Sequence, residues 1–253
     1  MRLSPYIILV FLGMIAMHNT FAAGNTDVQQ LLKEVEDKGA PPSERVQLKM
    51  IIQDSDGGKK ERVLSILRKN TKPSEGRALV RLLQPSDLKG LSLLTVAGGG
   101  KEDQWLYLPS DKKSRRILGS NKKGKFLDSE IAFEDMSIST YKEFANKVVK
   151  EDDKSILIES KAKPDSESSY SKVMTWVTKP DHHIEKVEYY DKGGKLFKRA
   201  EFKGYQKVGD KYWRVKQMLV TNLQSKRKTL LTLQKVSLKN IDDDEVSLSA
   251  LEE

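Results

Sequence analysis

The chain has 253 residues, a formal net charge of +9 and no cysteine. The lack of cysteine excludes disulfide bonds, a thiolate nucleophile and thiolate metal ligands. A chain of this length can bury one large apolar core, so its stability does not require cross-links.

The first 22 residues have the pattern of a secretory signal peptide. Arg2 supplies the positive charge, residues 6–17 form a short apolar run, and Thr20 and Ala22 are small residues at the −3 and −1 positions of a cleavage site. The run is shorter than the ~20 residues of a transmembrane helix, which disfavours the alternative of an uncleaved anchor. We therefore expect cleavage after Ala22 and one mature domain, residues 23–253. We expect it in the periplasm and not lipidated, because no cysteine can carry a lipid.

Removal of Arg2 with the leader lowers the formal net charge from +9 to +8. A basic protein often binds nucleic acid or an anionic surface. Export argues against nucleic acid, which leaves anionic lipid head groups, a membrane surface or an acidic partner. A lysine-rich surface that contacts only water is an equal alternative.

An amphipathic helix is predicted at the start of the mature chain. Apolar residues from Val28 to Val35 recur at positions i, i+3, i+4 and i+7, the spacing of one apolar stripe. Thr26 followed by Gln29 has the form of a capping box, and Gly39 with two prolines after it ends the helix.

Most of the remaining chain alternates apolar and polar residues between short polar turns, which predicts antiparallel strands. The expected strands are 46–52, 63–67, 77–83, 91–96, 103–108, 155–160, 170–178, 182–190, 195–202, 212–223 and 229–238. Long helices do not alternate with them, so a parallel α/β sheet is disfavoured. A meander of this many strands tends to curl. We predict a mainly β (α+β) fold: a curved antiparallel sheet of about ten or eleven strands that forms an incomplete barrel, with the N-terminal helix and a covering segment as the lid.

The covering segment is residues 103–136. It starts as a strand and continues for roughly thirty basic residues punctuated by Gly and Ser, and a structureless loop of that length is usually functional or disordered. A disordered segment does not normally keep apolar residues such as Ile117, Phe126, Ile131 and Phe133. We expect these side chains to anchor the segment on the sheet while its lysines stay in water.

Two groups of residues are candidates for binding. Most apolar side chains of the strands are expected to form an ordinary core, and those on the face that borders the lid can line a cavity for acyl chains. Cations of the covering segment can bind phosphate-bearing head groups or a partner, or can simply keep the loop solvated. The cavity candidates are Met50, Ile52, Leu64, Ile66, Leu79, Leu83, Trp105, Tyr107, Phe126 and Phe133. The head-group or partner candidates are Arg115, Arg116, Lys122, Lys123 and Lys125.

Catalytic motifs are sparse. His182 and His183 are adjacent, and adjacent strand residues point to opposite faces, so they do not form one acid–base device. Glu134 and Asp135 have no histidine nearby in sequence, and residues 242–245 lack the spacing and the glycine of a calcium loop. No nucleophile elbow, nucleotide-binding loop or zinc-protease motif occurs. We therefore expect no enzymatic activity, no cofactor and no bound metal.

The runs D-Q-W-L-Y-L-P, R-R-I and G-K-F-L-D-S-E-I-A-F-E-D-M within residues 103–136 resemble the signature of outer-membrane lipoprotein-sorting proteins of the LolA-like superfamily. They are most similar to the branch that accompanies RND/MMPL-type exporters, and the likeness extends more loosely over the mature chain. The residues that match the signature are Trp105, Tyr107, Pro109, Arg115, Arg116, Gly124, Phe126, Ser129, Phe133, Glu134 and Asp135.

The resemblance implies a periplasmic carrier, with an unclosed antiparallel barrel over helices and an apolar cavity for the acyl chains of a lipid or lipoprotein. It implies no catalytic residues. The arginine that latches the lid of the true lipoprotein chaperone is not assigned to a residue here, so lipid and lipoprotein are both open as cargo. We expect a monomeric shuttle that contacts membranes transiently, binds no nucleic acid and works with an RND/MMPL-type exporter of the inner membrane. The alternative is a non-catalytic periplasmic accessory or sensor module that binds a protein partner.

Overall fold

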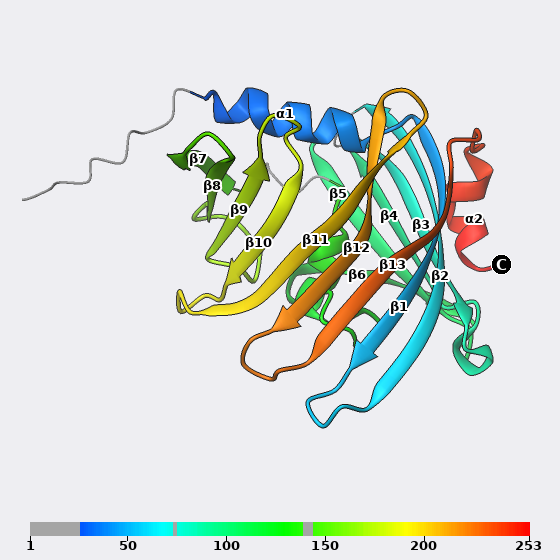
Figure 1. The fold of residues 1–253 in the computed structure, drawn as a ribbon. Coiled ribbons are helices and arrows are strands. Elements are labelled where there is room, and N and C mark those ends of the chain that lie inside the picture. Colours follow the sequence, from blue (N-terminus) through cyan, green and yellow to red (C-terminus); the bar gives the residue numbers. More distant parts are fainter. Residues whose placement is uncertain (1–25, 73–74, 139–143) are drawn as a thin grey trace, which may run out of the picture.

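The computed structural model describes residues 26–72, 75–138 and 144–253. These residues form one antiparallel sheet of thirteen strands, which curves into an open half-barrel (Figure 1). The strands are β1 (Ser43–Gln53), β2 (Lys59–Lys72), β3 (Glu75–Gln84), β4 (Ser92–Gly98), β5 (Lys101–Leu108), β6 (Lys113–Ile117), β7 (Phe144–Glu151), β8 (Ser155–Ala162), β9 (Lys172–Thr178), β10 (Ile184–Tyr190), β11 (Leu196–Val208), β12 (Tyr212–Asn222) and β13 (Lys228–Ser237). The helices are α1 (Val28–Gly39), α2 (Leu248–Leu251) and the short 3-10 helices η1 (Ser86–Leu88), η2 (Gly119–Lys123), η3 (Phe126–Asp128), η4 (Phe133–Met136) and η6 (Asp244–Val246).

Strands that follow one another in the sequence pair with each other, with one exception. β6 and β7 are not neighbours, and β1 pairs with β13 instead, so the sheet order runs from β6 through β1 and β13 to β7. The sheet is therefore an up-and-down barrel that is open between β6 and β7.

The predicted fold class is confirmed, and the strand number is thirteen where ten or eleven were expected. The two additional strands, β6 and β7, are the two edges of the sheet. Edge strands carry charges that prevent further pairing, and K-S-R-R-I and F-A-N-K-V-V-K-E have too many charged and polar residues for a clear apolar alternation. The covering segment is also shorter than expected, because residues 103–108 and 113–117 belong to the sheet itself. We call residues 118–136, which follow β6, the plug.

Helix α1 covers the inner face of one end of the sheet. Leu31 and Leu32 on its apolar stripe are buried against Ile156 and Ile158 of β8 and Val177 of β9. The stripe predicted from the sequence is therefore the face that packs. None of the helices in the described part of the chain is long and apolar enough to cross a membrane.

The cap of α1 differs from the prediction by one residue. Asp27 is the N-cap, and its Oδ1 accepts hydrogen bonds from the backbone N–H groups of Gln29 and Gln30. The hydroxyl of Thr26 instead donates to Glu151 of β7, at 2.8 Å. Thr26 therefore links the start of the helix to the edge strand.

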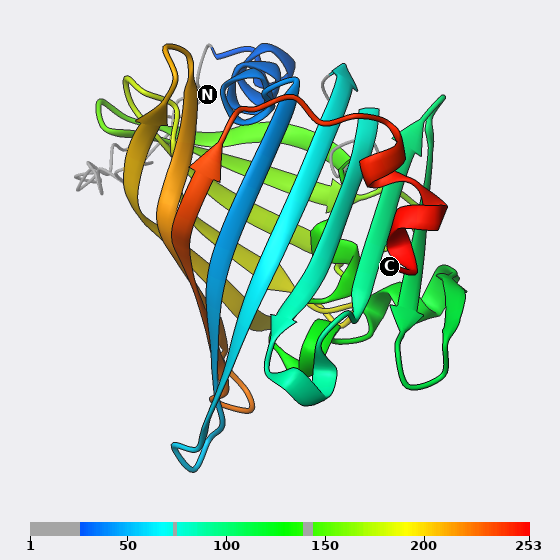
Figure 2. The ribbon, with the colours of Figure 1, turned by 90° about the vertical axis from the view of Figure 1, so that its right-hand side faces the viewer.

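The outer face of the sheet has its own cover at the C-terminus. Ile241, Val246 and Leu251 are fully buried against Leu79 of β3 and Leu94 of β4. Figure 2 shows this segment in red outside the strands. β3 and β4 thus carry apolar side chains on both faces.

The rest of the inner face forms the largest apolar cluster of the described residues, and the plug completes it. Residues of β1 to β6 and of β9 to β13 contribute to this cluster. Its fully buried members include Met50 and Ile52 of β1, and Leu82 and Leu93 of β3 and β4. The inner face of the half-barrel is therefore the candidate functional site.

Candidate functional site

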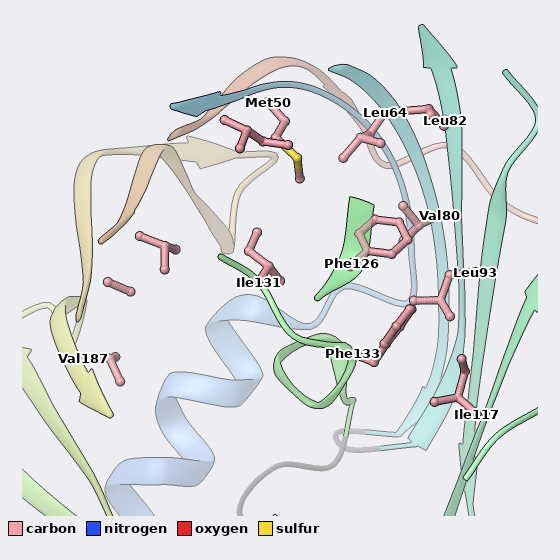
Figure 3. Close-up of a cluster of buried hydrophobic side chains, with 13 residues drawn as sticks. Met50, Leu64, Val80, Leu82, Leu93, Ile117, Phe126, Ile131, Phe133 and Val187 are labelled. Carbon is pink, nitrogen blue, oxygen red and sulfur yellow. The ribbon is translucent and has the colours of Figure 1, made fainter. Parts of the chain in front are cut away.

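The plug places three apolar side chains against the inner face of the sheet. Phe126, Ile131 and Phe133 are 1%, 8% and 9% exposed. The two phenyl rings meet edge to face, with their centroids 5.8 Å apart. Figure 3 shows the three side chains among those of the surrounding strands, including Met50 and Leu93. The plug therefore occupies the apolar surface that the curved sheet encloses.

The plug is held in shape by its own backbone hydrogen bonds. The N–H of Phe126 donates to the carbonyl of Ile131 at 2.8 Å, and the N–H of Phe133 donates to the carbonyl of Gly124 at 3.0 Å. Gly124 is needed for a close approach, because a Cβ there would lie 3.1 Å from the carbonyl oxygen of Asn121. The plug is therefore a compact unit with its own hydrogen bonds, and it packs against the sheet as a whole.

A buried ionic cluster joins the end of the plug to β11. The ammonium of Lys198, whose side chain is 4% exposed, lies 2.5 Å from Oδ2 of Asp135. It also donates to the hydroxyl of Tyr170 at 2.5 Å and lies 4.4 Å from the ring centroid of Tyr189. Every polar contact of this lysine is therefore made inside the protein.

Tyr170 completes this cluster as a neutral donor. Its hydroxyl donates to Oδ1 of Asp135 at 2.7 Å. Burial raises the pKa of the Tyr170 hydroxyl well above its ordinary value of 10.0, and the charge of Asp135 acts in the same direction. Asp135 thus accepts from Tyr170 and Lys198, and its Oδ2 also accepts from the backbone N–H of Ala132 at 2.7 Å.

A second polar cluster holds the middle of the plug at β12 and β13. Glu130 is 4% exposed, and its carboxylate accepts from Lys125 at 2.6 Å and from the side-chain amide of Asn222 at 2.9 Å. The backbone N–H of Glu130 donates to the hydroxyl of Thr229 at 2.8 Å. Arg227 adds a nearby positive charge, 3.6 Å from the same carboxylate.

Two further contacts complete the attachment. The amide of Gln104 on β5 donates to the carbonyl of Phe133 at 3.0 Å. The carboxylate of Glu134 accepts from the hydroxyl of Ser168 at 2.9 Å and from the backbone N–H of Ser169 at 3.0 Å, in the loop before β9.

The plug is therefore attached to the sheet without forming backbone-to-backbone hydrogen bonds with its strands. Among the described residues, each hydrogen bond between the plug and the strands involves at least one side chain, while the backbone bonds of the plug close within the plug. The isolated bridge between Lys125 and Ala132 is likewise internal. Detaching the plug would leave all thirteen strands paired as they are.

A small cleft opens where the plug meets β11 and β12. Its volume is about 240 Å³. Lys123 and Lys125 of the plug line it together with Lys198, Tyr170 and Asn222. Glu130 and Asp191 line it as well, and Lys125 and Lys198 are paired with Glu130 and Asp135, so Lys123 is the cation of the lining that forms no ion pair among the described residues.

The structure separates the ten predicted cavity residues into groups. Six of them lie together in the inner cluster with the plug: Met50, Ile52, Leu64, Ile66, Phe126 and Phe133. Leu79, Trp105 and Tyr107 belong to the outer cluster under the C-terminal segment, so they do not share a cavity with the six. Leu83 is the extra residue of a bulge between β2 and β3 and lies in neither cluster. The alternation along a strand assigns its residues to two faces of the sheet. Both faces are covered here and both carry apolar residues, so the pattern does not show which face is the inner one.

The five predicted cations also separate. Lys123 and Lys125 line the cleft and are exposed, whereas Lys122 is a half-buried neighbour on η2 outside the lining. Arg115 and Arg116 lie on β6 and form exposed ion pairs with Asp111 and Asp103, respectively.

Lys198, Tyr170, Glu130 and Gln104 were not predicted from the sequence. Lys198 did carry a signal, because it alternates with Ala200 and Phe202 and so falls on the inner face of its strand. A lysine at a core position needs a buried partner. The partner, Asp135, lies 63 positions away, and no local pattern identifies it.

The histidines and acidic residues examined for catalysis take part in structural contacts. His182 binds Glu34 of α1 at 2.9 Å, and the ring of His183 stacks on Tyr205 with centroids 4.1 Å apart. Burial lowers the pKa of His183. Glu245 pairs with Arg45 at 2.7 Å. In the part of the chain that the structure describes, no three His, Cys, Asp or Glu side chains are grouped as a metal site.

Replacing Lys198 by Met is expected to destabilise the protein by about 3–5 kcal/mol, because Asp135 is then a buried charge without its cation. The exposed Lys195, three residues away, is the matched control, and Lys195→Met should change the free energy of unfolding by about 0.5 kcal/mol or less. Urea unfolding at pH 7 measures both. The double variant Lys198→Met/Asp135→Asn should be more stable than Lys198→Met alone, because it removes the unpaired charge. Equal losses of unfolding free energy in Lys198→Met and Lys195→Met would contradict the assignment of the cluster.

Three solved structures resemble this arrangement over nearly the whole chain. A structure described as an outer-membrane lipoprotein-sorting protein domain, from Vibrio parahaemolyticus, is 27% identical, with a TM-score of 0.79 over 89% of this chain and 96% of that chain. A DUF1329 family protein from Desulfovibrio piger is 24% identical, with a TM-score of 0.81 over 88% and 96% of the two chains. A LolA superfamily protein from Nitrosomonas europaea is 18% identical, with a TM-score of 0.71 over 89% and 99%. The last two likenesses concern the fold alone.

No curated protein matches the chain. A family model described as "-like: Uncharacterized protein" matches residues 74–253, which is more than half of the chain. The protein therefore belongs to the family that this model describes, and its fold is the LolA-like fold of a lipoprotein-sorting domain.

Proposed function

We propose that this protein is a periplasmic carrier that binds the acyl chains of a lipid or lipoprotein on the inner face of its half-barrel and moves them between membranes. One observation carries the proposal: the plug covers a large apolar surface, yet none of its hydrogen bonds to the strands joins two backbone groups. A segment of this kind can leave the surface without disturbing the sheet. The 27% identical relative that is described as a lipoprotein-sorting domain supports the same role.

The free energy that holds the plug on the inner face is comparable to the free energy that an acyl chain gains when it is buried there. Full burial of a large apolar side chain is worth about 1.5–3 kcal/mol, so Phe126, Ile131 and Phe133 together contribute about 5–9 kcal/mol to holding the plug in place. An acyl chain gains about 0.8 kcal/mol per buried methylene, so about ten methylenes offset the loss of these contacts. Cargo can therefore compete with the plug for the inner face.

The cleft between the plug and strands β11 and β12 offers a place for the head group of the cargo. Lys123 and Lys125 are exposed at the border between the apolar inner face and water, and Lys198 is buried at the same cleft. An anionic head group placed there would keep its charge paired while its chains lie under β1 to β4. The carrier would be monomeric, would touch membranes only while loading and unloading, and would need no cofactor.

The expected signal peptide fits this location. Residues 1–22 lie outside the described residues, and we propose that they direct export and are removed, leaving residues 23–253 as one binding domain.

Locking the plug is expected to abolish uptake of acyl chains. Glu130 N and Thr229 Oγ1 lie 2.8 Å apart, and the native chain has no cysteine, so Glu130→Cys/Thr229→Cys introduces a single possible disulfide between plug and sheet. The oxidised variant should bind a fluorescent fatty acid at least about tenfold more weakly than the same variant after reduction.

Two measurements make this comparison decisive. The single variant Thr229→Cys should bind equally with and without reductant, which controls for the reductant and for the lost threonine. Intact mass confirms that the disulfide has formed. Equal uptake by the locked and reduced forms would show that acyl chains do not enter beneath the plug, and the proposal would fall.

We also propose that the carrier exchanges its cargo with an RND/MMPL-type exporter of the inner membrane, on the basis of the similarity of the plug region to that branch of the LolA-like superfamily. A photoactivatable residue in place of Lys122, which is partly exposed on the plug, should cross-link to such an exporter in cells. The same residue in place of Lys192, on the exposed turn between β10 and β11, is the control. Equal cross-linking from both positions, or none from Lys122, would count against this partnership.

A further inference from the structure

The wall of the half-barrel contains a second feature, a split between β12 and β13. The two strands pair only from Gln217 opposite Thr232 to Thr221 opposite Lys228. Beyond that point, residues 212–215 of β12 pair only with β11, and Leu233 and residues 235–237 of β13 pair only with β1. Figure 1 shows the two strands separating toward the end of the sheet where α1 lies.

Two strand edges therefore face each other across the split without a partner strand among the described residues. The backbone N–H and C=O groups along such edges have no ladder partner and form a template for an added strand, although the carbonyl of Trp213 accepts from Arg214 at 2.6 Å. Each unpaired stretch is five residues long, which matches an extended peptide of about five residues at ~3.3 Å per residue.

A cleft of about 450 Å³ lies at this split. This volume is within the range of about 300–1,000 Å³ that is typical of ligand sites. Leu233 and Val236 supply apolar surface, and Gln206, Gln217 and Gln234 supply polar groups. Gln234 is the extra residue of a bulge in β13, and it adds one more polar side chain to the lining.

The charge of the cleft has a single sign. Lys203, Lys216 and Lys235 line it, and no Asp or Glu does. These three lysines are exposed, and none of them forms an ion pair with another residue of the described ranges. The lining is therefore complementary to an anionic ligand.

We propose that the split between β12 and β13 binds an extended acidic segment of a protein partner by strand addition. The partner backbone would complete the interrupted ladder, and its carboxylates would pair with Lys203, Lys216 and Lys235. A small anion would pair with the lysines but leave both strand edges unpaired. An extended acidic peptide would contact both the lysines and the strand edges, so we favour the peptide. This site is separate from the inner face and does not depend on the acyl-chain proposal.

The test uses peptides of equal length and controlled charge. The probe is acetyl-Glu-Val-Glu-Val-Glu-amide, which carries three carboxylates for the three lysines. Acetyl-Glu-Pro-Glu-Pro-Glu-amide keeps the charge but lacks two N–H donors, and acetyl-Gln-Val-Gln-Val-Gln-amide keeps the strand but lacks the charge. Titration followed by amide NMR should show binding of the first peptide, with shifts at residues 212–216 and 233–237, and at least about tenfold weaker binding of the other two.

Matched variants separate the cleft from general charge effects. Lys203→Gln/Lys216→Gln/Lys235→Gln should weaken binding about tenfold, because three exposed ion pairs are each worth about 0.2–1 kcal/mol. Lys192→Gln/Lys195→Gln/Lys226→Gln removes the same charge from exposed positions elsewhere and should leave binding unchanged. Equal binding of the proline peptide, no binding of the first peptide, or displacement of the peptide by inorganic phosphate with the same amide shifts would each overturn the proposal.

Discussion

The missing pairing between β6 and β7 determines how the rest of this molecule is built. Because these two edges stay apart, the thirteen strands cannot close, and the apolar inner face has to be covered by something other than its own strands. Helix α1 covers β7 to β9, and the plug covers most of the remainder. The plug is the first part of the segment that connects β6 to β7. In a closed barrel, a short turn could join these two strands. One topological interruption thus creates both the apolar surface and the segment that occupies it.

The contacts of the plug divide into two kinds with different effects. Phe126, Ile131 and Phe133 supply most of the attraction, which is not directional and which an acyl chain can replace. The clusters around Lys198 and Glu130 contribute less net free energy, because desolvation of buried charges offsets much of their attraction. They fix where the plug lies on the sheet. A cover held in this way has a defined closed position and a modest cost of opening.

The sequence predicted the parts of this arrangement that depend on local patterns. Central strands such as β1 alternate clearly, and the plug could be recognised because Phe126 and Phe133 lie in an otherwise basic segment. The edge strands β6 and β7 were missed, since the charges that block further pairing also remove the alternation. The inner and outer positions of Ile52 and Leu79 could not be distinguished, because that choice depends on which distant segment covers each face. The pairing of Lys198 with Asp135 is a tertiary contact and has no local signature.

We propose that cargo replaces the plug on the inner face. Hydrogen–deuterium exchange of the protein, alone and loaded with an anionic phospholipid, tests it most directly. Amides of residues 124–136 are expected to exchange faster in the loaded protein, while those of β1 and β4 keep their protection because the backbone hydrogen bonds between the strands are intact. Unchanged protection of residues 124–136 in a protein shown by mass to carry the lipid would contradict it.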